Sequence, residues 1–125
     1  MNIEHIAIWT RNLEEMKAFY TEFFHGTASD KYINPKKQFE SYFIRFQSGT
    51  RLELMRRPDL AEGEETASGY AHMAFSLGSR EKVDEMTERF AESGFQVVGK
   101  PRVTGDGYYE SVIKDPDGNL VELTV

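Results

Sequence analysis

Two stretches decide the fold of this chain: EHIAI at residues 4–8 and AHMAF at residues 71–75. They place His5 and His72 at an offset of 72 − 5 = 67 residues, each in a run that alternates like a β-strand. Two further runs, RLELM at 51–55 and LVELT at 120–124, place Glu53 and Glu122 at an offset of 122 − 53 = 69 residues. The chain is therefore an internal duplication, in which each half opens on a histidine strand and closes on a glutamate strand.

Each half also has the pattern of one amphipathic helix after its first strand. Asn12 and Glu15 have capping-box spacing, apolar residues follow at helical intervals, and Gly26 is a stop signal. In the second half Ser79 is the expected cap and Gly94 the stop. The expected strands lie at residues 2–10, within 27–34, at 39–47 and 51–56, and then at 70–77, 95–99, 108–114 and 119–125.

This order of elements predicts an α+β protein of two tandem βαβββ modules whose strands form a curved mixed sheet, a cup. We expect a single domain over residues 1–125, because one domain is usual for a chain of this length. Module 1 covers about 1–57, an acidic linker covers 58–68, and module 2 covers about 69–125. The run DPDG at 115–118 predicts a tight turn before the last strand.

The composition excludes several kinds of protein. The chain has no cysteine, so disulfides, thiolate metal sites and a cysteine nucleophile are excluded. Its net charge of −6 argues against a nucleic-acid partner. No apolar run has the length of a membrane span, so we expect a soluble cytoplasmic protein without a membrane partner.

Strand alternation places His5, Glu53, His72 and Glu122 on the sheet faces that point away from the apolar side chains. Any one of them alone is more often an exposed or hydrogen-bonded side chain than a metal ligand. Two histidines and two glutamates in matching phase on duplicated units instead favour a metal-ligand set. Imidazole and carboxylate donors without thiolates suit a divalent Zn, Ni, Co, Mn or Fe ion.

Three motifs carry a family resemblance: His5–Ile8 with the helix start Asn12–Tyr20, GYAHMAF at 69–75, and DPDGNLVEL at 115–123. With them the chain resembles the vicinal oxygen chelate superfamily, which includes glyoxalase I, fosfomycin- and bleomycin-resistance proteins and extradiol dioxygenases. The resemblance covers nearly the whole chain and is closest to glyoxalase I-like proteins. It implies paired βαβββ modules that form a cup around a divalent metal ion.

The resemblance also implies which residues hold the metal. The His, Glu, His, Glu set of glyoxalase I maps onto His5, Glu53, His72 and Glu122. The two-histidine, one-glutamate set of fosfomycin-resistance enzymes and dioxygenases maps onto His5, His72 and Glu122. Short members of the superfamily commonly pair as dimers with each site built from both chains, so a homodimer is expected.

Two positions depart from the bacterial glyoxalase I pattern. Trp9 stands where that enzyme has an arginine that helps to hold glutathione, and Arg57 stands where it has an asparagine. We therefore expect weak activity, or none, with the glutathione adduct of methylglyoxal.

The expected function is that of a metal-dependent lyase or isomerase, similar to lactoylglutathione lyase, with a small α-oxo or hydroxycarbonyl substrate. Glu122 is the expected proton-transfer base, with Glu53 as its counterpart. A metal ion that chelates two neighbouring oxygens would stabilise the charge that develops during this transfer. The alternatives are a protein that binds an antibiotic or metabolite without turnover, and metal-assisted epoxide opening or dioxygenase chemistry.

Overall fold

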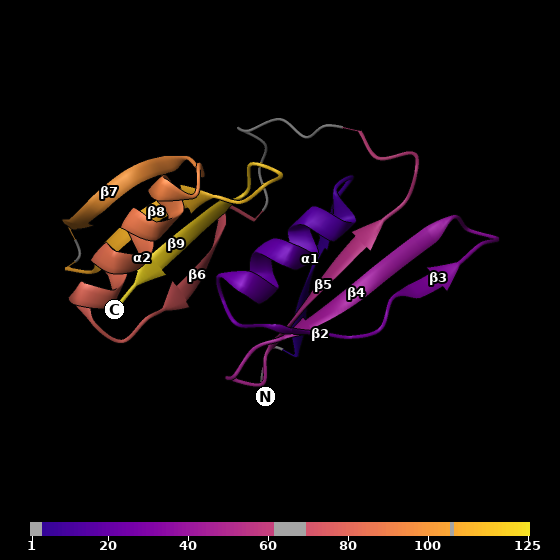
Figure 1. Ribbon diagram of the computed structural model, residues 1–125, viewed down its shortest axis with the longest axis horizontal. Helices are drawn as coiled ribbons and strands as arrows, with labels where there is room; N and C mark the ends of the chain where they lie inside the picture. The colour runs from indigo at the N-terminus through magenta and orange to yellow at the C-terminus, as the bar shows by residue number, and fades with distance from the viewer. Residues whose placement is uncertain (1–3, 62–69, 106) are drawn as a thin grey trace. The chain divides into compact units, whose positions relative to one another are not determined.

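The computed structural model describes residues 4–61, 70–105 and 107–125. The chain forms two compact units, Met1–Ala67 and Ser68–Val125 (Figure 1). Most of the predicted linker, residues 62–68, lies outside the described residues. The predicted α+β class with two βαβββ modules is confirmed, and each module forms its own curved mixed sheet.

The first unit has a sheet in the order β1-β5-β4-β2, with β3 also paired to β4. Strand β1 runs parallel to β5, whereas β2, β3 and β5 run antiparallel to β4. Its elements are β1 (His5–Trp9), α1 (Leu13–Glu22), β2 (Thr27–Ala28), β3 (Tyr32–Asn34), β4 (Phe39–Arg45) and β5 (Arg51–Arg56).

The strand that was expected within residues 27–34 is split into β2 and β3, which both pair with β4. Ser29 lies in the gap, where its N–H donates to the Phe43 carbonyl at 2.8 Å. Its Oγ accepts a hydrogen bond from the Phe43 N–H at 3.0 Å. A side-chain oxygen thus takes the place of a ladder carbonyl where the strand is interrupted.

The second unit repeats this topology in the order β6-β9-β8-β7, with β6 parallel to β9. Strand β7 extends beyond the predicted 95–99 and includes Pro101, which an edge strand tolerates because its outer N–H positions need no partner. Its pairing with β8 has register shifts on both sides of Gly99. The elements are β6 (His72–Ser76), α2 (Arg80–Glu92), β7 (Val97–Val103), β8 (Tyr109–Lys114) and β9 (Leu120–Thr124).

The helix signals were right in the second unit and partly wrong in the first. Ser79 caps α2, since its side chain accepts a hydrogen bond from the Lys82 N–H at 3.3 Å, and Gly94 follows with φ +86°. In the described first unit, Asn12 precedes α1 without a side-chain capping bond. Helix α1 ends at Glu22, before Gly26. Position 26 instead requires a residue without a side chain, because a Cβ there would lie 2.3 Å from a methyl group of Ile44.

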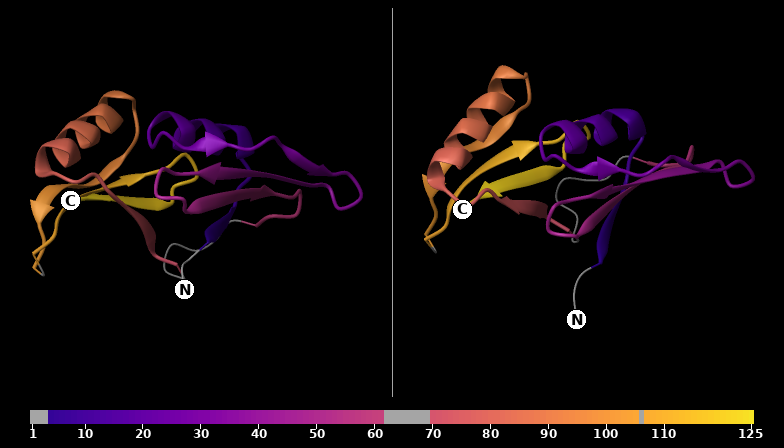
Figure 2. Two further views of the ribbon diagram at one scale, coloured as in Figure 1. Left: turned by 90° about the horizontal axis from the view of Figure 1, so that it is seen from below. Right: turned by 60° about the horizontal axis from the view of Figure 1, so that its bottom comes forward.

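Each helix covers one face of its own sheet and leaves the opposite face without a helix from that unit (Figure 2). The apolar side chains between helix and sheet are buried, as their alternation predicted. They are Leu13, Met16, Phe19, Tyr20, Phe23, Tyr42, Ile44, Leu52 and Leu54 in the first unit, and Val83, Phe90, Ile113, Val121 and Leu123 in the second. Among the described residues, neither helix combines the length and the apolar composition that crossing a membrane requires.

Candidate metal centre

In the first unit the parallel pairing of β1 with β5 brings His5 and Glu53 together. The register sets His5 opposite Arg51 and Ala7 opposite Glu53, so the glutamate lies two residues further along on the same face. The distance between His5 Nε2 and Glu53 Oε2 is 3.9 Å. The imidazole side chain is 41% exposed and the carboxylate side chain 18% exposed.

The second unit builds the same pair from β6 and β9. His72 lies opposite Leu120 and Ala74 lies opposite Glu122, which is the same stagger of two residues. His72 Nε2 and Glu122 Oε2 are 3.3 Å apart, with side-chain exposures of 42% and 19%. The duplication seen in the sequence is therefore preserved at the level of individual side chains.

These donors fit a borderline divalent metal ion. Two ligand atoms that each lie about 2.1 Å from a tetrahedral metal are roughly 3.4 Å apart, close to the 3.3 Å and 3.9 Å found here. Within the described residues, no three His, Asp or Glu side chains gather into a metal cluster. Each unit thus supplies one imidazole and one carboxylate, and the union of the two pairs in one site stays a prediction.

His5 has a second contact that the sequence reasoning missed. Its Nδ1 lies 2.5 Å from Glu4 Oε2, and the Arg51 Nε donates to the other oxygen of Glu4 at 2.7 Å. The hydrogen bond with His5, aided by Arg51, holds the pKa of Glu4 below its ordinary value. The Arg51 guanidinium also lies over the Phe43 ring, 4.1 Å from its centroid. The available signal was the position of Glu4 directly before the histidine.

The DPDG run forms a turn that fixes the entry into β9. The Gly118 N–H donates to the Asp115 carbonyl at 2.9 Å. The Asp115 side chain, which is buried, accepts hydrogen bonds from the N–H groups of Asp117 at 3.0 Å and Asn119 at 2.8 Å. This turn sets the register of β8 against β9 and thereby the place of Glu122.

The two departures from the glyoxalase pattern contact one another. The Arg57 guanidinium lies 4.5 Å from the centroid of the Trp9 ring, a cation–π distance. Trp9 also packs edge-on against Phe39, and Arg57 forms an ion pair with Asp59 at 3.0 Å. Residues that looked like independent changes in the sequence therefore form one aromatic–cation wall next to the end of β1.

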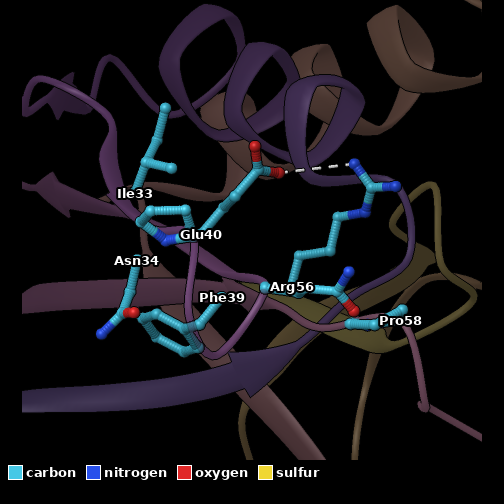
Figure 3. Close-up of a pocket in the computed structure, with 8 residues that line it drawn as sticks. Ile33, Asn34, Phe39, Glu40, Arg56 and Pro58 are labelled. Atoms are coloured by element: carbon cyan, nitrogen blue, oxygen red, sulfur yellow. Dashed lines mark hydrogen bonds and ion pairs between the residues drawn. The ribbon is translucent and has the colours of Figure 1, made fainter.

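A pocket of about 300 Å³ lies in the first unit, at the hairpin between β3 and β4 (Figure 3), and neither His5 nor Glu53 lines it. Glu40 and Arg56 form an ion pair of 3.4 Å across it. Of the described residues that line it, none is a predicted metal ligand. The lining residues are Ile33, Asn34, Pro35, Gln38, Phe39, Glu40, Arg56 and Pro58.

Two curated proteins are similar to this chain over almost its whole length. The uncharacterized protein YqjT of Bacillus subtilis (strain 168) is 29% identical over 130 residues, which cover 97% of this chain and 96% of YqjT. The metallothiol transferase FosB of Shouchella clausii (strain KSM-K16) is 27% identical over 122 residues, which cover 97% of this chain and 77% of FosB.

Solved structures show the same fold. The glyoxalase family protein from Enterococcus faecalis superposes with a TM-score of 0.83 at 24% identity, over 99% of this chain and 97% of that one. Glyoxalase I from Zea mays gives a TM-score of 0.83 at 20% identity over 98% of this chain, which spans only 44% of the maize chain. The sequence profile of the Glyoxalase/Bleomycin resistance protein/Dioxygenase superfamily matches residues 2–123. The chain therefore belongs to the Glyoxalase/Bleomycin resistance protein/Dioxygenase superfamily.

Proposed function

We propose that this protein is a divalent-metal-dependent lyase or isomerase of the glyoxalase type, with a small substrate that carries oxygens on adjacent carbons. One observation carries the proposal: each unit places a histidine and a mostly buried glutamate side by side in the same register. The proposed ligands of a single Zn, Ni, Co, Mn or Fe ion are His5, Glu53, His72 and Glu122.

The chemistry follows from the types of side chain. When bound, the ion would polarise both substrate oxygens and stabilise the negative charge that develops on them. Glu122 accepts a proton from one substrate carbon and returns it to the adjacent carbon, so that no oxidant or reductant is needed. Glu53 is the matching carboxylate of the other unit and serves as the second proposed proton carrier.

The contact between Trp9 and Arg57 indicates which substrate to expect. The Trp9 ring and the Arg57 guanidinium contact each other. By the resemblance, Trp9 stands where a bacterial glyoxalase I has an arginine that helps to hold glutathione, and Arg57 stands where it has an asparagine. We therefore propose a substrate other than the glutathione adduct of methylglyoxal.

A second candidate is a metal-assisted group transfer that opens an epoxide. Its support is the similarity to FosB, whose name describes a metallothiol transferase. A third candidate, binding of an antibiotic or metabolite without turnover, is supported by the resistance proteins in the superfamily.

Glu122→Gln tests the enzyme proposal. It keeps the shape of the side chain and removes its basicity, so turnover per bound metal ion should fall by at least about 100-fold, while the metal-loaded protein keeps nearly the same affinity for the substrate. The measurement is steady-state kinetics on a panel of hydroxycarbonyl, thiohemiacetal and epoxide substrates, with ligand binding followed by calorimetry.

Glu110→Gln is the matched control, because Glu110 lies on the neighbouring strand of the same sheet and pairs with Arg102 instead of a histidine. It should retain turnover. Tight binding of a ligand that is released unchanged, with and without metal, would replace the enzyme proposal by the binding-protein candidate.

A further inference from the structure

The two histidines differ in what holds them, although their partners Glu53 and Glu122 are equivalent. Glu4 precedes His5 and contacts its Nδ1. Arg51 lies opposite His5 in the strand register, and its side chain donates to Glu4. The repeat offsets place Ala71 (4 + 67 = 71) and Leu120 (51 + 69 = 120) at the equivalent positions of the second unit. Neither of these side chains can donate or accept a hydrogen bond.

Glu4 is fixed by three contacts. The Arg51 side chain donates to Glu4 Oε1 at 2.7 Å. The Arg51 backbone N–H donates to the Glu4 carbonyl at 3.1 Å. The remaining carboxylate oxygen, Oε2, lies at His5 Nδ1. Since Glu4 precedes β1 it is outside the strand alternation, which leaves its side chain able to reach the histidine.

An ionised carboxylate only accepts hydrogen bonds, so its imidazole partner must donate from Nδ1. A neutral imidazole with its proton on Nδ1 has its lone pair on Nε2. Nε2 is the atom of His5 that faces Glu53, at 3.9 Å. The contact with Glu4 therefore selects the tautomer whose free nitrogen points at the neighbouring carboxylate.

We propose that Glu4 and Arg51 are positioning residues that lock His5 as the Nδ1–H tautomer and orient its Nε2 for a divalent metal ion. His72 has no such support from the equivalent positions, so the first unit holds the pre-oriented half of the ligand set. The metal part of this inference rests on the proposed function, whereas the tautomer part does not.

The first test is the tautomer in metal-free protein, read by NMR of ¹⁵N-labelled histidine at about pH 8, above the range in which free imidazole titrates. His5 should give the Nδ1–H signature in the wild type and lose it in Glu4→Ala. Glu4→Gln should restore it, because an amide oxygen also accepts from Nδ1–H. The His72 signals should not change in either variant.

The second test is the affinity for zinc, measured by competition with a chromophoric chelator. Loss of the supporting carboxylate in Glu4→Ala should weaken binding about 10- to 100-fold, with a smaller loss in Glu4→Gln and in Arg51→Met. Glu85→Ala is the control, because it removes the same charge from an exposed position of α2. Circular dichroism confirms that each variant is folded.

The outcomes distinguish a failure of the positioning role from a failure of the proposed function. An unchanged His5 tautomer in Glu4→Ala, or a loss of zinc affinity no greater than in Glu85→Ala, overturns the positioning role. If no variant and no wild-type protein binds zinc, cobalt or nickel, the proposed function fails, and the tautomer result alone decides whether Glu4 positions His5.

Discussion

At the scale of single residues, the members of each His–Glu pair differ in their exposure. The imidazoles of His5 and His72 are 41% and 42% exposed, whereas Glu53 and Glu122 are 18% and 19% exposed. The carboxylates lie against the sheet and the imidazoles reach toward solvent. In the proposed metal site, the exposed imidazole is the donor that an incoming ion would meet first, and the shielded carboxylate is the donor whose charge water screens less.

His5→Ala and His72→Ala should each lower metal content severely, because each removes half of the donors from its unit. His25→Ala is the control: His25 is exposed, lies outside every helix and strand, and has a left-handed backbone with φ +54°. The measurement is metal content by mass spectrometry after dialysis against zinc. Equal metal content in all three variants would refute the assignment of His5 and His72.

The sequence indicated these residues because strand alternation is strict. It did not indicate Glu4, since a glutamate next to a strand histidine is usually solvated and only its contact with Arg51 marks it out. It indicated Gly26 as the stop signal of the first helix, but α1 ends earlier, at Glu22, and Gly26 instead lies close to Ile44.

At the scale of elements, a buried hydroxyl pair joins α2 to β8. Thr87 Oγ1 donates to the Val83 carbonyl at 2.6 Å and lies 2.6 Å from Ser111 Oγ, which then donates to it. Both hydroxyls are buried, and the Ser111 hydroxyl uses Thr87 Oγ1 as its acceptor. This link fixes the position of the helix along the strand that neighbours β9.

Thr87→Val should destabilise the protein by about 1–3 kcal/mol, because it leaves the Ser111 hydroxyl buried without its acceptor. Adding Ser111→Ala should recover part of this loss, since both polar groups are then gone. Urea denaturation measures both changes. Thr21→Val is the control: Thr21 makes the same bond to a carbonyl of its own helix, Lys17, but is partly exposed, and it should cost about 0.5 kcal/mol or less. Equal losses at Thr87 and Thr21 would contradict the coupling.

In the first unit, Glu14 of α1 joins Lys31, which precedes β3, to Tyr42 of β4. The Lys31 Nζ donates to Glu14 at 2.8 Å and the Tyr42 hydroxyl donates to it at 3.1 Å. The hydrogen bond from Lys31, together with that from Tyr42, lowers the pKa of Glu14. The folded state therefore favours ionised Glu14 more than the unfolded state does, so this contribution is present above the unfolded pKa and is lost at lower pH.

Glu14→Gln should accordingly lower stability by about 1 kcal/mol or less at pH 7, because the Glu14 side chain is 60% exposed. The difference from wild type should shrink as the pH falls below about 4.3, the ordinary value for an unfolded glutamate. Urea denaturation at several pH values measures it, with the exposed Glu15→Gln as control. A difference that is constant from neutral to acidic pH would show that the charge of Glu14 does not contribute.

Element boundaries could be predicted where one signal dominates. Strand β5 coincides with the predicted 51–56, because its alternation is regular and its ends are polar. Strand β7 was predicted too short, since Pro101 reads as a strand breaker until its place at the sheet edge is known. The predicted capping box at Asn12 was wrong, because the Asn12 side chain makes no capping hydrogen bond. The Asn12 N–H donates to the Thr10 hydroxyl at 2.9 Å.

At the scale of the whole molecule, the repeat offsets predicted two modules with the same order of elements. The strand order of each sheet, with its first and last strands side by side, was not predicted and is seen only in the structure. The sequence did not predict whether the two His–Glu pairs of a metal site come from the same chain. His5 pairs with Glu53 and His72 with Glu122 inside their own units, so a complete set of four can come from one chain or from two copies.

We predict a homodimer in which each site combines the first unit of one chain with the second unit of its partner. Sedimentation at micromolar concentration should show the dimer. After unfolding and refolding together, His5→Ala and His72→Ala proteins should regain about a quarter of the metal sites, because half of the dimers are mixed and each has one intact site. A monomer in sedimentation, or a mixture that regains no metal, would contradict the shared site.

The parallel pairing that creates each His–Glu pair has a consequence for how the protein is made. It joins the first and last strands of a unit, which are 53 − 5 = 48 and 122 − 72 = 50 residues apart at the paired side chains. Contacts of such long sequence separation close late, after local hairpins such as β8–β9 have formed. During synthesis the histidine of each unit leaves the ribosome well before its glutamate. A growing chain therefore gains its His–Glu pairs only when each unit is nearly complete. Capture of metal at the proposed site would then wait until the sheet that orients the pair exists.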